Sequence, residues 1–173
     1  MMLPCFAPYT FRRRISQKHR RWQGSSDVIL WLDTFNNHFH PETAEAALEV
    51  LQAAGYRVGI PRLALCCGRP LYDFGFLDTA KRLLREILDH LQPELESGTP
   101  IVVLEPSCAA VFRDELVNLF PEDANAKRLC QQTFLLSEFL DKNENTSVSQ
   151  IVGKAIVQGH CHQSRLWGWR ARP

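Results

Sequence analysis

Apolar segments of two kinds alternate along this chain, and the alternation restricts the folds that it can adopt. Short runs rich in Val, Ile and Leu are typical of buried strands, whereas longer stretches with apolar residues at every third or fourth position are typical of helices. Strands are predicted at residues 27–32, 56–61, 100–104 and 154–158. Helices are predicted at residues 41–55, 77–93, 109–120 and 134–140. Strands that alternate with helices predict an α/β fold, a mostly parallel sheet with covering helices.

Reactive side chains follow each of these predicted strands. A polar loop, residues 33–41, follows the first strand, and Cys66-Cys67-Gly68 follows the second. Cys108 follows the third strand, and His160-Cys161-His162 follows the fourth. The carboxyl ends of parallel strands meet at one edge of a sheet, where ligands bind in open α/β folds, so these loops are predicted to converge there. The sequence thus gathers thiols and imidazoles without a local CxxC motif.

Cys66-Cys67-Gly68 is the feature that packing alone explains least well. Adjacent side chains of a regular strand face opposite ways, so both thiols cannot enter one core from a strand. Both can reach one metal centre if the backbone turns sharply, and Gly68 permits such a turn. The alternative is a pair of buried small apolar side chains at the end of a strand.

Cys66, Cys67 and Cys108 form the core of the predicted metal site, because thiolates bind iron–sulfur clusters or zinc. Three cysteines are one fewer than the usual four, and the two remaining loops supply candidates for the fourth ligand. These candidates are Asp33, His38 and His40 in the first loop, and Cys161 with His160 and His162 in the last. The alternatives are structural: a capping acid, a buried thiol at a helix N-terminus and a polar loop without a ligand. Cys5 and Cys130 lie away from the strand ends and are predicted to be incidental.

Composition limits the class of protein further. The chain is 45% hydrophobic and 23% charged, as in an ordinary globular protein. No apolar run reaches the about 18 residues of a transmembrane helix, and the opening residues do not form a signal peptide. Six cysteines without a signal indicate the cytosol, with thiols or metal ligands rather than a disulfide framework. Neither a GxGxxG nor a P-loop motif is present, so no nucleotide site is predicted.

Charge is distributed unevenly, although its net value is only +1. The segment before Asp27 is basic and has no acidic residue; it contains Arg12, Arg13, Arg14, Lys18, Arg20 and Arg21. Such a segment can bind nucleic acid or anionic lipid, or it can be the end of a linker. The linker is favoured because no periodic pattern supports a binding helix, and no nucleic acid partner is expected. We therefore divide the chain into a basic tail or linker (1–26), a main domain (27–158) and a terminal segment (159–173).

These motifs resemble the cysteine-rich CCG domain of the heterodisulfide reductase type. That domain also occurs in the iron–sulfur subunits of glycolate oxidase and anaerobic glycerol-3-phosphate dehydrogenase, and at the carboxyl end of FAD-linked D-lactate dehydrogenase-type oxidases. Cys66-Cys67-Gly68 matches the CCG motif, and Pro106-Ser107-Cys108 matches the later cysteine element. Residues 33–42 resemble the loop that carries the first cysteine, and residues 159–162 resemble the opening of a second copy of the domain. The resemblance covers residues 28–165.

The chain departs from the family pattern at identifiable positions. Asp33 or Thr34 stands where the first cysteine is expected, and Val111 stands where the second cysteine of a CxxC occurs. Residues 166–173 do not continue a second copy of the domain. From the resemblance we expect a fragment or a frameshifted product of a longer FAD-linked oxidoreductase.

The resemblance implies an iron–sulfur electron-transfer module of an FAD-linked oxidoreductase that acts on 2-hydroxy acids such as D-lactate or glycolate. It implies a 4Fe–4S-type cluster held by Cys66, Cys67 and Cys108, with Asp33 as a weaker oxygen ligand and Cys161 as a further candidate. FAD belongs to the parent enzyme and is not expected to bind this chain, for which no catalytic residue is predicted. The implied partners are a flavin-containing dehydrogenase domain or subunit and a quinone or other electron carrier. The implied location is cytoplasmic, or peripheral to the inner face of the membrane.

Three other functions use the same residues. A zinc-binding structural module would hold one closed-shell ion on the same cysteines. A metal-free interaction domain would tolerate replacement of the cysteines by Ser or Ala. A thiol redox site would form a reversible disulfide between Cys66 and Cys67.

Overall fold

Four short parallel strands form the sheet at the centre of the fold. In this computed structural model, residues 5–18, 26–142, 153 and 161 are described. The strands are β1 (Val28–Trp31), β2 (Val58–Gly59), β3 (Ile101–Val103) and β4 (Thr133–Leu135), in the spatial order β2-β1-β3-β4. Every neighbouring pair is parallel, with Ile29 opposite Ile101 and Ile101 opposite Thr133. The α/β fold with a parallel sheet is therefore confirmed.

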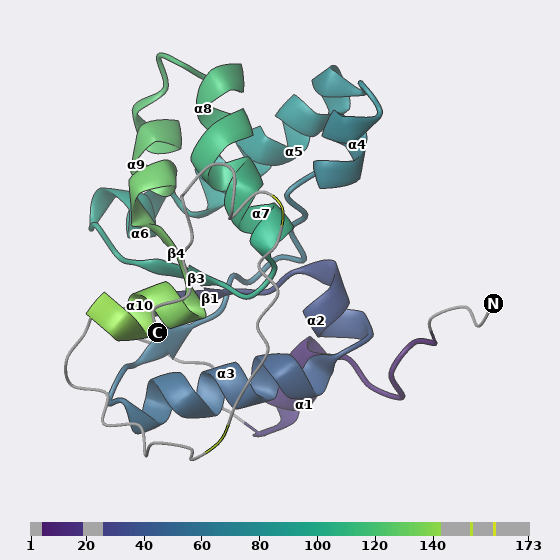
Figure 1. The fold of residues 1–173 in the computed structure, drawn as a ribbon, viewed down its shortest axis with the longest axis vertical. Helices are drawn as coiled ribbons and strands as arrows, with labels where there is room; N and C mark the ends of the chain where they lie inside the picture. The colour runs from purple at the N-terminus through teal and green to yellow at the C-terminus, as the bar shows by residue number, and fades with distance from the viewer. Residues whose placement is uncertain (1–4, 19–25, 143–152, 154–160, 162–173) are drawn as a thin grey trace.

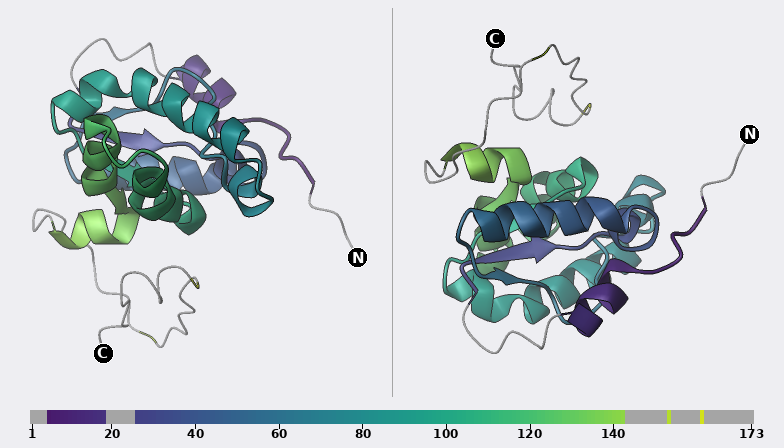
Figure 2. Two further views of the ribbon diagram at one scale, coloured as in Figure 1. Left: turned by 90° about the horizontal axis from the view of Figure 1, so that it is seen from above. Right: turned by 90° about the horizontal axis from the view of Figure 1, so that it is seen from below.

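Helices cover both faces of the sheet (Figures 1 and 2). One face packs against α1 (Phe11–Lys18), α3 (Pro41–Ala53) and α10 (Leu136–Lys142). The other face packs against a larger group: α5 (Leu77–His90), α6 (Gln92–Glu96), α7 (Pro106–Ala110), the π-helix η1 (Val111–Glu115), α8 (Leu116–Leu119) and α9 (Ala124–Gln132). Two short helices, α2 (Thr34–His38) and α4 (Arg69–Asp73), follow β1 and β2. No helix in these described segments is long and apolar enough to cross a membrane.

Strand β1 shows how the sequence produces two cores. Ile29 and Trp31 point into the cluster beneath α5 and η1, whereas Val28 and Leu30 point into the cluster beneath α3. Successive side chains of a strand face opposite sides of a sheet, and all four of these side chains are apolar and buried. A strand buried on both faces reads as a continuous hydrophobic run, which is why β1 could be predicted from the sequence.

The last strand lies elsewhere than the sequence predicted. Residues 134–140 were expected to be one helix, but Thr133–Leu135 forms β4 beside β3 and only then does α10 begin. A β-branched and an aromatic residue favour the pleated conformation here, and three residues are too few to show a strand period. The strand predicted at residues 154–158 lies outside the described residues.

Helices also occur in segments where no regular structure was predicted, and α4 directly after the CCG turn is one of them. The polar loop after β1 contains α2, whose first turn is capped by Asp33. The connection after α8 contains α9, because the Asp123 carboxylate accepts hydrogen bonds from the backbone N–H groups of Asn125 and Ala126 at 2.8 and 3.1 Å. Within the basic segment, residues 11–18 form α1.

Helix α1 is fixed to the domain by the aromatic side chain of Phe11 and by cationic side chains, with Arg14 pairing with Glu45 on α3 at 3.2 Å. Phe11 is fully buried in the cluster beneath α3. The Arg12 guanidinium donates to the backbone carbonyls of Pro61 and Leu63 at 2.7 and 2.6 Å. One buried Phe and backbone carbonyls leave no periodic pattern in a sequence, so this contact could not be predicted.

Phe112 is predicted to be a major source of stability. Its ring is fully buried and packs edge-on against Trp31, with ring centroids 4.9 Å apart. Phe112→Ala removes this contact and leaves a cavity, so we expect a loss of about 3–5 kcal/mol of unfolding free energy in urea denaturation. Phe76→Ala is the matched control: Phe76 is 62% exposed, and its truncation is expected to change the free energy by less than about 0.5 kcal/mol. Equal losses in the two variants would contradict the packing argument.

The Asp27–Arg57 pair predicts a specific acid sensitivity. Hydrogen bonds from the Arg57 side chain lower the pKa of Asp27 to about 2 from 3.8. A depressed carboxyl pKa contributes stability at pH values above the unfolded pKa, and that contribution is lost as the pH falls from about 4 to about 2. Asp27→Asn is therefore expected to flatten the pH dependence of thermal stability in this interval. The same change in an Arg57→Ala background is expected to have little further effect, and an unaltered acid profile in Asp27→Asn alone would contradict the assignment.

Candidate thiol site

The segments that follow β1, β2 and β3 meet at one edge of the sheet. Asp33 follows β1, the Cys66-Cys67-Gly68 turn follows β2, and Cys108 follows β3 on the first turn of α7. Because the three strands are parallel neighbours, their carboxyl ends lie side by side. The predicted convergence of these loops is thus present in the structure. Strand β4 continues directly into α10.

The CCG turn separates its two thiols. Gly68 has φ of 74°, a left-handed conformation that glycine adopts without steric cost, and it immediately precedes α4. The turn leaves Cys66 exposed and buries Cys67. The adjacent side chains therefore point into different environments, and only Cys67 enters the core cluster.

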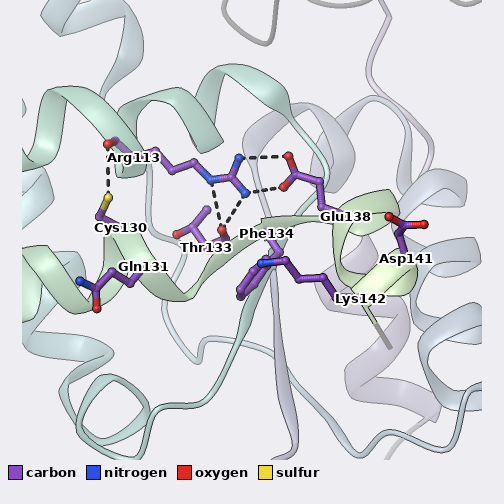
Figure 3. Close-up of a pocket in the computed structure, with 8 residues that line it drawn as sticks. All are labelled: Arg113, Cys130, Gln131, Thr133, Phe134, Glu138, Asp141 and Lys142. Carbon is purple, nitrogen blue, oxygen red and sulfur yellow. Dashed lines mark hydrogen bonds and ion pairs between the residues drawn. The ribbon is translucent and has the colours of Figure 1, made fainter. Parts of the chain in front are cut away.

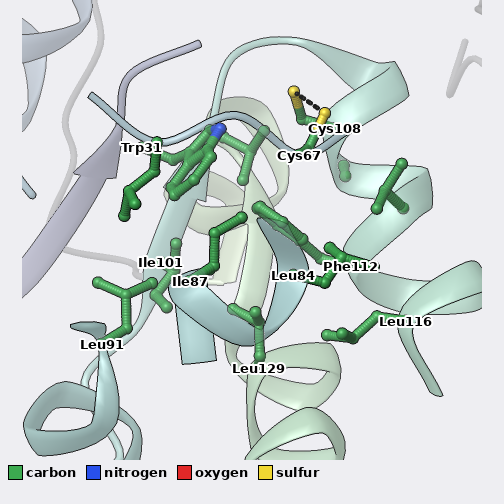
Figure 4. Close-up of a cluster of buried hydrophobic side chains, with 14 of the residues drawn as sticks. Trp31, Cys67, Leu84, Ile87, Leu91, Ile101, Cys108, Phe112, Leu116 and Leu129 are labelled. Carbon is green, nitrogen blue, oxygen red and sulfur yellow. Dashed lines mark hydrogen bonds between the residues drawn. The ribbon is translucent and has the colours of Figure 1, made fainter. Parts of the chain in front are cut away.

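The Cys67 thiol contacts that of Cys108, which lies far from it in the sequence. Their Sγ atoms lie 3.1 Å apart, and the two side chains are 6% and 5% exposed. Figure 4 shows the two sulfurs facing each other at one edge of the buried cluster. Cys66 in turn shares a hydrogen bond with Cys67, so contacts join the three thiols in a row from the surface to the core.

The environment of these thiols favours their protonated forms. The pKa of Cys67 is raised, first by its hydrogen bond with Cys108 and then by burial, against an opposing hydrogen bond from Cys66. The pKa of Cys66 is raised by its hydrogen bond with Cys67 and by burial. Packed thiols disfavour adjacent negative charge, so a cation bound among them would reverse this preference.

Thr34 lies beside this row of thiols, whereas the Asp33 carboxylate caps α2. Both carboxylate oxygens of Asp33 accept hydrogen bonds from Asn36, at 2.9 Å from its backbone N–H and 2.6 Å from its side chain. Asp33 thereby caps α2 and is 3% exposed. The Thr34 side chain lies close enough to Cys66 to lower the pKa of that thiol slightly. Of the two residues at the position of the expected first cysteine, Thr34 is the one that contacts a predicted ligand.

The remaining candidate ligands are used otherwise or lie apart. His38 Nε2 is 2.9 Å from the Asn37 side chain, and His40 pairs with Glu42 at 3.2 Å. Cys161 is an exposed free thiol, and the flanking His160 and His162 lie outside the described residues. Within the described part of the chain, no three His, Cys, Asp or Glu side chains form a group that could hold a metal ion. The thiols of Cys66, Cys67 and Cys108 form a row rather than a closed set of ligands.

Two features beside the thiols were not predicted. The Arg69 guanidinium, directly after the CCG turn, pairs with the buried carboxylate of Glu115 on η1 and with Asp73 at 3.0 Å. The indole Nε1 of Trp31 is buried and has no hydrogen-bond partner. A buried donor without an acceptor is costly, and Figure 4 shows Trp31 in the same cluster as Cys67 and Cys108. Sequence position alone marks Arg69 as a neighbour of the motif but gives no sign of either partnership.

A hollow of about 450 Å³ lies away from the thiols, beside β4, and is lined by residues of η1, α9, β4 and α10. Arg113 spans it, donating to the Thr133 carbonyl at 2.8 Å and to the Glu138 carboxylate (Figure 3). The Cys130 thiol donates to the Arg113 carbonyl at 3.3 Å. This hollow contains none of the three thiols of the row, and its Arg113 and Glu138 side chains pair with each other.

The donor set of the row fits a thiophilic metal centre. Cysteine sulfurs bind metals as soft thiolates, so the three thiols suit iron–sulfur clusters or zinc rather than Mg²⁺ or Ca²⁺. The unpartnered Trp31 N–H is a group that a metal-bound sulfur could satisfy, since hydrogen bonds to sulfur are a common feature of such centres.

Comparison with known proteins places these motifs in a family. Residues 33–113 match the family described as a cysteine-rich domain, CCG. The chain is 31% identical over 153 residues to lactate utilization protein A of Anoxybacillus flavithermus, covering 85% of this chain and 62% of that protein. It is 31% identical to the protein of the same name from Geobacillus kaustophilus and 29% identical to that from Bacillus subtilis, covering 84% of this chain and 62% of each relative.

The chain thus spans about three fifths of the length of the curated relatives that it matches. No solved structure shows significant similarity to it. The family match begins at the cap of α2, includes both cysteine motifs and ends in η1, so it contains the whole row of thiols. The family that residues 33–113 match is thus the one that the cysteine motifs indicated.

Proposed function

We propose that this domain holds an iron–sulfur centre through Cys66, Cys67 and Cys108 and passes electrons in the oxidation of lactate. The contact between Cys67 and Cys108, 3.1 Å across two loops, carries the proposal, since it joins both cysteine motifs at one place. The CCG family match and the relatives named lactate utilization protein A support it. When bound, such a centre accepts and releases single electrons.

The residues of the site would divide the work according to their burial. Cys67 and Cys108 would hold the buried side of the centre and keep water away from it, because both are more than nine-tenths buried. Cys66 would hold the exposed side, where an electron donor or acceptor can approach. The buried Trp31 N–H, which has no partner, would be available to donate a hydrogen bond to sulfur, and Thr34 or Asp33 would stand at the position of the absent thiol.

The wider assignment belongs to the same proposal. We infer a 4Fe–4S-type cluster, a partner that carries flavin and oxidises a 2-hydroxy acid, and a quinone or other carrier as the electron acceptor. A location in the cytoplasm or at the inner face of the membrane would suit these partners. Asp33 and Cys161 are further candidate ligands in this proposal, and Asp33 would have to release the α2 cap to bind a metal.

Anaerobic expression with metal analysis tests the proposal. The wild-type chain is expected to contain iron and acid-labile sulfide and to show broad visible absorption. Cys67→Ser is expected to lose most of its iron and its colour, because it removes the central thiol of the row. Cys130→Ser is the matched control: this partly buried cysteine lies in α9, outside the row, and its replacement is expected to leave the iron content unchanged.

Two other results would contradict the proposed centre. Stoichiometric zinc without colour, lost in Cys67→Ser but not in Cys130→Ser, would assign the row to a structural zinc site. Absence of metal after anaerobic purification and after reconstitution with iron and sulfide would leave a metal-free domain.

A further inference from the structure

Cys67 and Cys108 form a thiol pair that is close to covalent bonding distance. Their Sγ atoms are 3.1 Å apart, and a disulfide bond of about 2.05 Å requires them to approach by about 1 Å. We propose that this pair is a reversible disulfide site in the metal-free chain, with hydrogen peroxide as its oxidant. This inference goes beyond the proposed function and does not require that a metal binds.

Local structure allows the approach of the two sulfurs. Cys67 lies in the irregular segment between β2 and α4, which can shift without breaking a helix or a strand. Cys108 is fixed on the first turn of α7, whose N-terminus is capped by Glu105 through Ser107. Cys67 can move while Cys108 stays fixed on its helix, so a small change in the CCG turn can bring the two sulfurs to disulfide geometry.

The adjacent pair Cys66–Cys67 is the less suitable partner set. The Cα atoms of neighbouring residues are about 3.8 Å apart, whereas disulfide-bonded cysteines have Cα separations of about 4.4–6.8 Å. The CCG turn also directs Cys66 to the surface and Cys67 to the core. The structure therefore assigns the bridge to Cys67 in the CCG turn and Cys108 on α7, rather than to the neighbouring thiols of Cys66 and Cys67.

The chemistry balances with one molecule of peroxide. One thiol gives up its proton as its sulfur attacks a peroxide oxygen; the O–O bond breaks, the sulfur becomes a sulfenic acid, and the proton joins the leaving hydroxide to form water. The second thiol attacks that sulfur, a second water leaves, and the S–S bond forms. Two cysteines lose two electrons and two protons in total, and the peroxide is reduced to two waters. A small oxidant suits this site because both thiols are buried.

Oxidation would have a defined consequence for metal loading. The bridge takes Cys67 and Cys108 out of the three thiols in the row, so the oxidised chain would not accept a thiolate-bound centre. Only this consequence rests on the proposed function. Bound metal and disulfide would be mutually exclusive states of the same two sulfurs.

Peptide mapping of the full chain tests the bridge. Metal-free, reduced protein is treated with hydrogen peroxide, its remaining thiols are alkylated, and it is digested with trypsin without reduction. Cleavage at Lys and Arg gives one fragment, residues 63–81, with Cys66 and Cys67, and another, residues 86–113, with Cys108. We expect these fragments to be joined in the wild type, two hydrogen atoms lighter than their sum, and separated by dithiothreitol.

Three variants assign the bridge to individual sulfurs. Cys66→Ser leaves Cys67 as the sole thiol of the first fragment, and the joined fragments are expected to persist in it. Cys67→Ser and Cys108→Ser are each expected to lose them completely. Loss of the joined fragments in Cys66→Ser, a bridge between Cys66 and Cys67, or only sulfinic acid at Cys67 and Cys108 would overturn the proposal. Metal analysis of the untreated chain is a separate measurement, so failure of the iron–sulfur assignment remains distinguishable from failure of the bridge.

Discussion

The parallel pairing of β1 with β2 on one side and β3 on the other is the constraint on which the site depends. It places the carboxyl ends of three strands side by side, so loops that are far apart in the sequence begin at neighbouring points. Both faces of β1 are buried, and a one-residue slip would move each side chain into the opposite core, where side chains of other sizes are packed. The separation of Cys67 and Cys108 is therefore set by the sheet as much as by the loops that carry them.

Polar interactions fix the helices and turns that follow the strands. Asp33 caps α2 and Glu105 caps α7, so the two acids that directly follow β1 and β3 serve to start helices. The pairing of Arg69 with Glu115 links the end of the CCG turn to the helical segment that carries Cys108. Truncating one partner of a buried ion pair leaves the other charge uncompensated, which makes this link important for the alignment of the two cysteine motifs.

Much of this architecture could be predicted from the sequence, and the limits have physical reasons. The first three strands and the helices at α3 and α5 carry strong periodic signals, and parallel topology follows from their alternation. The sheet gains its fourth strand from Thr133–Leu135, which is too short to show a period. The role of α1 depends on one buried Phe and on backbone carbonyls, which leave no trace in composition.

The candidate site could likewise be predicted only in part. Residue type and position after a strand identified Cys66, Cys67 and Cys108 as neighbours. The same reasoning did not show that the Asp33 carboxylate accepts hydrogen bonds from Asn36 or that Thr34 lies beside Cys66. Nor did it show that Trp31 lacks a hydrogen-bond acceptor. These properties depend on side-chain directions that tertiary packing determines.

The long sequence separation between Cys67 and Cys108 also affects the order in which the protein can mature. The segment between them contains α4, α5, α6 and β3, so the two sulfurs meet only after this whole unit has docked on the sheet. A compact CxxC motif can capture metal in an unfolded chain and thereby drive folding. Here the thiols of Cys67 and Cys108 lie in separate regions of the unfolded chain. Closing the long loop between them costs conformational entropy that no native contact yet offsets. Folding must therefore precede the assembly of any centre on these sulfurs, and a chain that misfolds will not retain one.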